Sequence, residues 1–382
     1  MKQKILLFLA VILCFGVFVG GVQASGDTTD QINEEDYSEE IIPGKVIAII
    51  KDDYETLETS GGDYVQKIQV LKVKLTKGEE KGKLIEVYNT VDGIMANSFD
   101  AKVGDELYCG IERDDQGNIV QGYISEVKRD RYLIYLVIAF VLLTVIVGGI
   151  KGIKTLFTLG ITIVGVYFML KGIISGQNPV VISIIVSFVV TIITMFVIGG
   201  FNKKAIAAIA GTLSGVIIAG TISLIIGYYA NLSGLETSES QMLLYTTGTV
   251  KLDFKGILFA SILLGTLGAV MDVCMSISSS IKELKDNNPI MTVGQLFKSG
   301  MNIGKDVMGT MSNTLILAYA GTSMCLMLLF MVNKMTLVDI VNMELISTEI
   351  VRALAGTIGL IVSIPITAIV ASLLAKGDYS KV

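Results

Sequence analysis

The chain has 382 residues, of which 52% are hydrophobic and only 17% are charged. It contains no histidine, so the side chain most often used for proton transfer near neutral pH and for metal binding is missing. Residues 25–127 hold 23 acidic and 10 basic residues, a net charge of −13, which argues against nucleic-acid binding by this part of the chain.

The first 24 residues predict a secretory signal peptide. A basic start, MKQK, precedes a long apolar run, and VQA at 22–24 supplies small residues for cleavage. An uncleaved anchor is the alternative, and in both cases the segment that follows is exported. Lipidation at Cys14 is disfavoured because the preceding Leu13 is not small. Residues 25–42 are acidic and poor in large apolar side chains, which predicts a disordered linker.

Residues 43–128 predict a small extracytoplasmic β domain. Five short runs rich in Val, Ile and Tyr are separated by turn-forming segments such as KGEEKGK and DDQGN. A barrel or a sandwich fits this spacing, and an OB-like barrel is one form of it. OB-folds often bind oligonucleotides or sugars, but this domain is acidic and lacks a basic face studded with aromatic residues. We therefore expect a structural or partner-docking module.

Residues 129–382 predict a transmembrane domain of about seven helices. Apolar runs of about 20 residues match a hydrocarbon core about 30 Å thick. The runs are 132–150, 155–175, 179–200, 205–229, 256–280, 309–332 and 352–375. The expected fold class is an α-helical multi-pass membrane protein preceded by a small exported all-β domain.

The distribution of basic residues predicts the orientation of these helices. With the β domain outside, the inner loops and the C-terminal tail hold ten lysines, whereas the outer segments hold five basic residues. This favours an extracytoplasmic β domain and a cytoplasmic C-terminus. In the inner loop 282–308, Thr292 and Gln295 form a T-x-x-Q capping-box pattern ahead of an amphipathic run, so we expect a short inner-face helix near 292–308.

Small residues recur every four positions along the fourth apolar run, which predicts a surface for close helix packing. A proline in the seventh run, Pro365, is expected to kink or break that helix because it lacks an amide hydrogen. Hydroxyl stripes on other runs are interpreted as packing surfaces too, since such hydroxyls often bond to their own helix. The predicted packing residues are Ala207, Gly211, Gly215 and Ala219.

The fifth apolar run carries the candidate functional residue, Asp272. A carboxylate near the middle of a bilayer costs roughly 2.5–3.5 kcal/mol, so such residues are rare and usually functional. Hydroxyl residues follow Asp272 on the same helical face, whereas Val270, Cys274 and Ile277 occupy the opposite side. Two polar residues of the sixth run are expected at a similar depth. The candidate ion or substrate path is Asp272, Ser276, Ser279, Ser280, Asn313 and Thr314.

A carboxylate among hydroxyl and amide oxygens suits a proton or a metal ion. Two alternatives stay open: a protonated structural acid that is hydrogen-bonded between helices, and a carboxylate that simply lies near the membrane interface. The sequence leaves unknown whether a metal binds.

Two long segments resemble a known family. LGAVMDVCMSISSSIKEL, followed by GKDVMGTMSNTLILAYAGTS, is similar to the signature region of the YibE/F-like family of bacterial multi-pass membrane proteins. The resemblance extends over most of the membrane domain and, more weakly, to the exported domain through LTKGEEKGK and VGDELY. It implies a bacterial plasma-membrane protein, and it assigns neither an activity nor a site residue.

The residues favour a secondary transporter or an ion-coupled permease of unknown substrate. No nucleotide-binding glycine loop or histidine-based triad is present, and GKDVMGT does not match a phosphate loop, so no enzyme activity and no cofactor are expected. Runs two to four and runs five to seven begin on opposite sides, as an inverted repeat would. The alternative is a non-transporting membrane subunit or scaffold whose β domain docks or senses a partner. The expected partners are the lipid bilayer, a small ion or small-molecule substrate, and a membrane or extracytoplasmic protein, but no nucleic acid.

Overall fold

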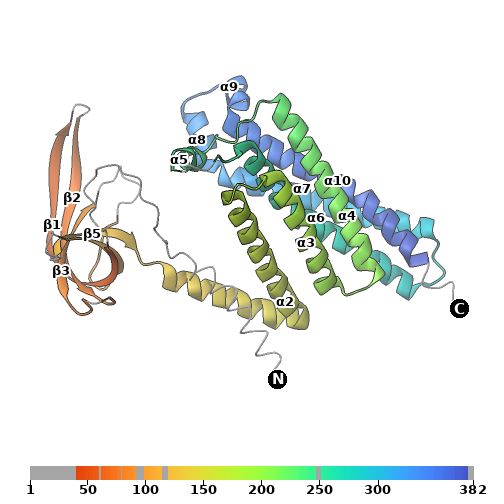
Figure 1. Cartoon of the computed structure of the whole chain (residues 1–382), viewed down its shortest axis with the longest axis horizontal. Helices are drawn as coiled ribbons and strands as arrows, with labels where there is room; N and C mark the ends of the chain where they lie inside the picture. Colours follow the sequence, from red (N-terminus) through yellow and green to blue (C-terminus); the bar gives the residue numbers. More distant parts are fainter. Residues whose placement is uncertain are drawn as a thin grey trace. The chain divides into compact units, whose positions relative to one another are not determined.

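A computed structural model describes residues 40–59, 62–78, 80–91, 99–113, 119–246 and 251–376. The chain divides into two compact units, with a boundary between Leu143 and Thr144 (Figure 1). The predicted signal peptide, Cys14 and residues 25–39 of the predicted linker lie outside the described residues, and the first strand begins at Glu40.

The first unit contains a closed five-stranded barrel (Figure 1). Its strands follow the order β1-β2-β3-β5-β4, and β3 and β5 form its parallel pair. This confirms the expected small β-barrel, and the Greek-key closure over five strands is that of an OB-like fold. The strands are β1 (Glu40–Thr59), β2 (Gly62–Leu75), β3 (Leu84–Val91), β4 (Glu106–Arg113) and β5 (Ile119–Val127).

The length of β1 allows the barrel to close. Its first residues, Glu40 to Lys45, pair with β4, and from Gly44 onward it pairs with β2. Inward-facing side chains alternate with exposed ones, as β3 shows most clearly. Cys109 lies in this core as a free thiol, and burial raises its pKa to about 11. The core side chains include Val46, Leu71, Val73, Leu75, Val87, Leu107, Cys109 and Ile111.

A buried polar network lies among the strands of the barrel, centred on Gln69, which is fully buried. Its Nε2 donates to Asp100 Oδ1 at 2.9 Å and to the Ala101 carbonyl at 3.2 Å. Its Oε1 accepts from Asn89 Nδ2 at 2.9 Å and from the Ala101 amide at 3.0 Å. Both ends of the Gln69 amide are satisfied, so this network stabilises the barrel.

The second unit is helical and contains the membrane-crossing elements except the first part of α2, residues 130–143, which belongs to the first unit. Among the described residues, five helices are long and apolar enough to span a bilayer, and a pair bent by 62°, α7 and α8, would make a sixth. This confirms a multi-pass helical membrane domain. The helices are α2 (Asp130–Ile174), α3 (Pro179–Gly199), α4 (Lys203–Tyr229), α5 (Ser238–Thr246), α6 (Phe254–Asn287), α7 (Val293–Thr322), α8 (Met324–Val332), α9 (Leu337–Asn342) and α10 (Glu344–Lys376).

All seven predicted apolar runs fall on these helices, and the first two share α2. That element has 45 residues, enough for two consecutive helices that could each cross a hydrocarbon core. Its backbone is non-helical at Gly149, where φ is 54° and ψ is −129°. The break lies at the end of the first predicted run, so α2 consists of two helices, one for each run.

Polar side chains cap most of these helices. Asn178 accepts from the first-turn amides of α3, Asn202 does so for α4 and Asp253 for α6. Thr292 and Gln295 form the reciprocal capping box at the start of α7. α7 then continues to Thr322, so the segment 292–308 is the first half of a long helix instead of a separate inner-face helix.

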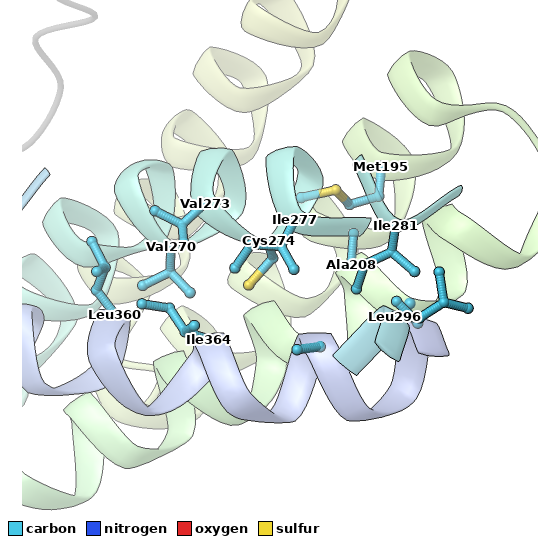
Figure 2. Close-up of a cluster of buried hydrophobic side chains, with 13 residues drawn as sticks. Met195, Ala208, Val270, Val273, Cys274, Ile277, Ile281, Leu296, Leu360 and Ile364 are labelled. Atoms are coloured by element: carbon cyan, nitrogen blue, oxygen red, sulfur yellow. The ribbon is translucent and has the colours of Figure 1, made fainter. Parts of the chain in front are cut away.

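The core of the helical unit lies where α4, α6 and α10 meet. Figure 2 shows Val270, Cys274 and Ile277 of α6 beside Leu360 and Ile364 of α10. The small residues of α4 make this approach possible.

A Cβ atom added at Gly215 would lie 2.8 Å from the Gly359 carbonyl oxygen of α10. Gly211 is equally restricted, because a Cβ there would collide with Thr367. Ala207 and Ala219 are fully buried on the same helix. α10 continues through Pro365 without ending there.

Candidate functional site

The two faces of α6 differ in burial. Val270, Cys274 and Ile277 are fully buried, whereas Gly268, Asp272 and Ser276 are exposed on the opposite side. The exposed side is polar or small instead of apolar, which is unusual for a helix within a bilayer. We define the α6 stripe as six residues of α6 that follow one another at steps of three or four positions on this side of the helix. They are Ser261, Gly265, Gly268, Asp272, Ser276 and Ser279.

Asp272 lies in the middle of the α6 stripe. Its backbone carbonyl accepts a hydrogen bond from Ser276 Oγ at 2.7 Å. Within the described part of the chain, its carboxylate makes no hydrogen bond and no ion pair. An acid bridged between two helices would need a partner on the second helix, and none of the described residues fills that role. Gly268, one turn away, has no atom within 4 Å of the position that a Cβ would occupy, so the space beside Asp272 is open.

α7 runs antiparallel along one side of the α6 stripe. Near its start, Gly304 packs on Ile277, and near its end the Tyr319 hydroxyl lies 2.8 Å from the position of a Cβ on Gly265. These two contacts fall on either side of Asp272 along α6. The part of α7 between them, around Thr310 to Thr314, therefore lies beside the level of Asp272.

Ser312 lies at this level on the less exposed side of α7, the side from which Met308, Met311 and Leu315 pack against the core. It follows Gly304 by eight residues and precedes Tyr319 by seven, so the three share one face of the helix. Its hydroxyl oxygen is buried and makes no hydrogen bond within the described part of the chain. A hydroxyl in this state can still donate one hydrogen bond and accept others.

The predicted α7 residues Asn313 and Thr314 are exposed. Asn313 is one position after Ser312 and so points about 100° away from it. Thr314 Oγ1 donates to the Thr310 carbonyl of its own helix at 2.9 Å. The structure thus brings Asp272 and Ser276 together on α6, with Ser279 and Ser280 partly buried one turn further, and it shows no bond from Asp272 to Asn313 or Thr314 among the described residues.

An ion pair lies at the other end of the α6 stripe. Arg352 of α10 donates from Nη1 to Ser261 Oγ at 3.2 Å, and its Nε lies 3.4 Å from Glu349 Oε1. Arg352 and Glu349 also act electrostatically on Tyr319. Ser261 is three turns before Asp272, about 16 Å along the helix, so Arg352 cannot neutralise Asp272 directly.

Four of these residues were missed by the sequence prediction. Ser261 and Gly265 could have been found by extending the spacing of the α6 stripe backward from Gly268. Ser312 and Tyr319 carried no such signal, because their position depends on the register between α6 and α7.

The described residues contain no group of three or more His, Cys, Asp or Glu side chains placed to hold a metal ion. The α6 stripe offers a single carboxylate with hydroxyl oxygens. Divalent calcium takes six to eight oxygen ligands, whereas a proton needs one carboxylate and a monovalent cation can keep part of its water.

The fold and the α6 stripe define a multi-pass membrane protein with an N-terminal β-barrel. Residues 136–377 match the model of the YibE/F-like protein family, and residues 36–127 match the YibE/F family N-terminal domain. The chain therefore belongs to the YibE/F-like family, as the resemblance in the sequence implied. Searches of curated proteins and of solved structures gave no match.

Proposed function

We propose that this protein is a secondary transporter or ion-coupled permease in which Asp272 binds a proton or a monovalent cation on a path along the α6 stripe. One observation carries the proposal: the Asp272 carboxylate lies on an open, polar face of a membrane-crossing helix.

The chemistry follows from the cost of charge in the bilayer. An ionised carboxylate is unfavourable in hydrocarbon, and it becomes neutral when it takes up a proton or pairs with a cation. Asp272 is therefore the group that binds and releases the ion. Ser276 Oγ donates its proton to the Asp272 carbonyl, so its lone pairs face outward as acceptors. Ser312 supplies a second oxygen from α7.

The break between α7 and α8 supports a moving part near one end of the path. The two helices meet at 62° around Ser323, four residues after Tyr319. Discontinuous helices commonly form the sites of secondary transporters. A movement at this break would carry the Tyr319 hydroxyl toward or away from Gly265, which opens or closes the end of the path near Arg352.

The open side of the α6 stripe must be covered by a polar protein surface within the membrane. α7 borders one side of the α6 stripe, but lipid chains offer no hydrogen bond to a carboxylate on the open side. We expect a further protein surface to cover that side and to enclose the path.

Ion flux in proteoliposomes tests the proposal. The purified full-length protein is reconstituted, gradients of H⁺, Na⁺ or K⁺ are imposed, and an internal pH dye is read. We expect flux from the wild type and a loss of at least about tenfold in Asp272→Asn, because an amide can neither release a proton nor neutralise a cation. Asp306→Asn is the matched control, since Asp306 is an exposed carboxylate on α7 outside the α6 stripe.

Equal flux from the wild type and Asp272→Asn would remove Asp272 from the path. An absence of flux from the wild type under every gradient would contradict an ion path and favour the scaffold interpretation.

A further inference from the structure

Lysines from three separate segments meet at one end of the helical unit. Lys151 and Lys154 follow the break in α2, Lys203 and Lys204 begin α4, and Lys282 lies near the end of α6. A cavity of about 70 Å³ lies at this end, between α4, α6 and α10. We call it the basic pocket; its lining includes Asn202, Lys203, Lys204, Ser278, Lys282 and Lys285. One acidic residue, Asp286, also lines it, so basic residues outnumber acidic ones by four to one.

Not all of the lysines at the basic pocket are available for a ligand. Lys285, which also lines the cavity, is 8% exposed and donates to the carbonyl oxygens of Pro289 at 2.6 Å and Met291 at 2.9 Å. These bonds hold the turn that follows α6. Lys285 therefore has a structural role.

Lys204 and Lys282 are the lysines free to bind an anion. In the part of the chain that the structure describes, neither forms an ion pair or a side-chain hydrogen bond. The Lys204 ammonium is half-buried and lies in the field of Lys282, Lys151 and Lys154, and Glu283 opposes that field. Like charges at such a site repel one another, and a bound anion would relieve the repulsion.

The start of α4 adds to the positive potential. α4 begins at Lys203, and its Asn202 cap satisfies the Ala205 amide at 3.1 Å. The positive end of the helix dipole thus points toward the basic pocket, where it favours a negative group.

We infer that the basic pocket binds the phosphate head group of an anionic phospholipid. The cavity lies at the ends of membrane-crossing helices, where lipid head groups are found, and Ile281, Ala371 and Ala375 give it an apolar side for the start of the acyl chains. Lys204 and Lys282 hold the phosphate, and Ala375, which is partly exposed, contacts the glycerol region. This site is separate from the α6 stripe and does not depend on transport.

Native mass spectrometry of the full-length protein in detergent tests the inference. Phosphatidylglycerol and phosphatidylcholine are titrated separately, and the dissociation constants are compared. We expect tighter binding of phosphatidylglycerol and at least about fivefold weaker binding in the Lys204→Gln/Lys282→Gln variant, because each basic residue contributes about 1 kcal/mol, or about fivefold, to the attraction. Lys204→Arg/Lys282→Arg should keep the wild-type affinity.

The matched control is Lys298→Gln/Lys305→Gln, which removes the same charge from exposed positions of α7. Equal losses in the two glutamine variants would overturn the inference, since general attraction to the positive charge would then explain binding. Equal affinity for the two lipids would overturn it as well. Displacement of phosphatidylglycerol by soluble glycerol phosphate at equal concentration would show that free phosphate is the ligand. Thermal unfolding of each variant verifies that it is folded.

Discussion

Asp272 of α6 and Arg352 of α10 illustrate how two charges in the helical unit can have different environments. Arg352 is paired with Glu349 and bonded to Ser261, so it links α10 to α6. Asp272 lies three turns away, and no described residue pairs with its carboxylate. The first charge is compensated within the protein, whereas the second is the one that we propose is neutralised by a proton or a cation.

The Arg352–Glu349 pair gives a prediction at the residue scale. Arg352→Ala leaves Glu349, with a side chain 26% exposed, without its cation. We expect a loss of about 1–3 kcal/mol in the free energy of unfolding, since a partly buried charge without a partner is costly. Glu349→Gln in the same chain should recover most of the loss. Denaturant unfolding in detergent measures the free energy of unfolding of the single and the double variant. If Arg352→Ala/Glu349→Gln is no more stable than Arg352→Ala, the charge left on Glu349 is not the cause of the loss.

Single residues could be predicted from the sequence where the signal is local. The helical period predicts that Asp272 and Ser276 lie on one side of α6 and that three apolar residues lie on the other. The structure has Asp272 and Ser276 exposed, and it buries Val270, Cys274 and Ile277. Asn313 was chosen by depth alone, which cannot tell which way a residue points. Ser312 lies at the level of Asp272 because the register between α6 and α7 is set by Gly304 and Tyr319, far apart in the sequence.

At the scale of elements, close approach of backbones organises the helical unit. Gly215 and Gly359 lie so close that a Cβ on either would be within 3 Å of the other's carbonyl oxygen. Small residues spaced by four on α4 therefore bring α10 nearer than larger side chains would allow.

Gly215→Ala tests this packing. The added methyl group would lie 2.8 Å from both the Gly359 carbonyl oxygen and Ser363 Cβ, so the helices must separate. We expect a loss of about 1–3 kcal/mol, the usual cost of overpacking, seen as a lower thermal midpoint in detergent. Gly309→Ala is the control, because nothing lies within 4 Å of a Cβ at Gly309. Equal midpoints for the two variants would show that the α4–α10 contact is not tight.

The sequence predicted that each helix exists better than it predicted the residues at which the helix begins and ends. Apolar runs of the right length indicated each membrane-crossing segment, but α7 combines an amphipathic start with an apolar end in one helix of 30 residues. Its capping box at Thr292 marks the start correctly, whereas Ser323 at the bend makes no side-chain capping bond, and no proline marks the bend. In the barrel, the strands follow from local patterning, but the double pairing of β1 that closes it depends on contacts distant in the sequence.

On the scale of the whole molecule, two polar features occupy a chain that is otherwise suited to a bilayer. The α6 stripe places a carboxylate along a membrane-crossing helix, and the basic pocket places Lys204 and Lys282 near the ends of such helices. The barrel has a satisfied polar network and an apolar core. The residues of the proposed ion path therefore all lie in the helical unit.

The central claim is that water and ions reach the α6 stripe, and cysteine accessibility in native membranes tests it without knowledge of the substrate. In a chain whose natural cysteines are replaced, Ser276→Cys is compared with Ile185→Cys, an apolar position on α3 that is 55% exposed. A charged, membrane-impermeant thiol reagent is added, and the modified fraction is measured. We expect rapid modification at Ser276→Cys and none at Ile185→Cys, because a thiol forms the reactive thiolate only where water reaches it. If Ser276→Cys is as unreactive as Ile185→Cys, the α6 stripe faces lipid or packed protein, and the ion path is contradicted.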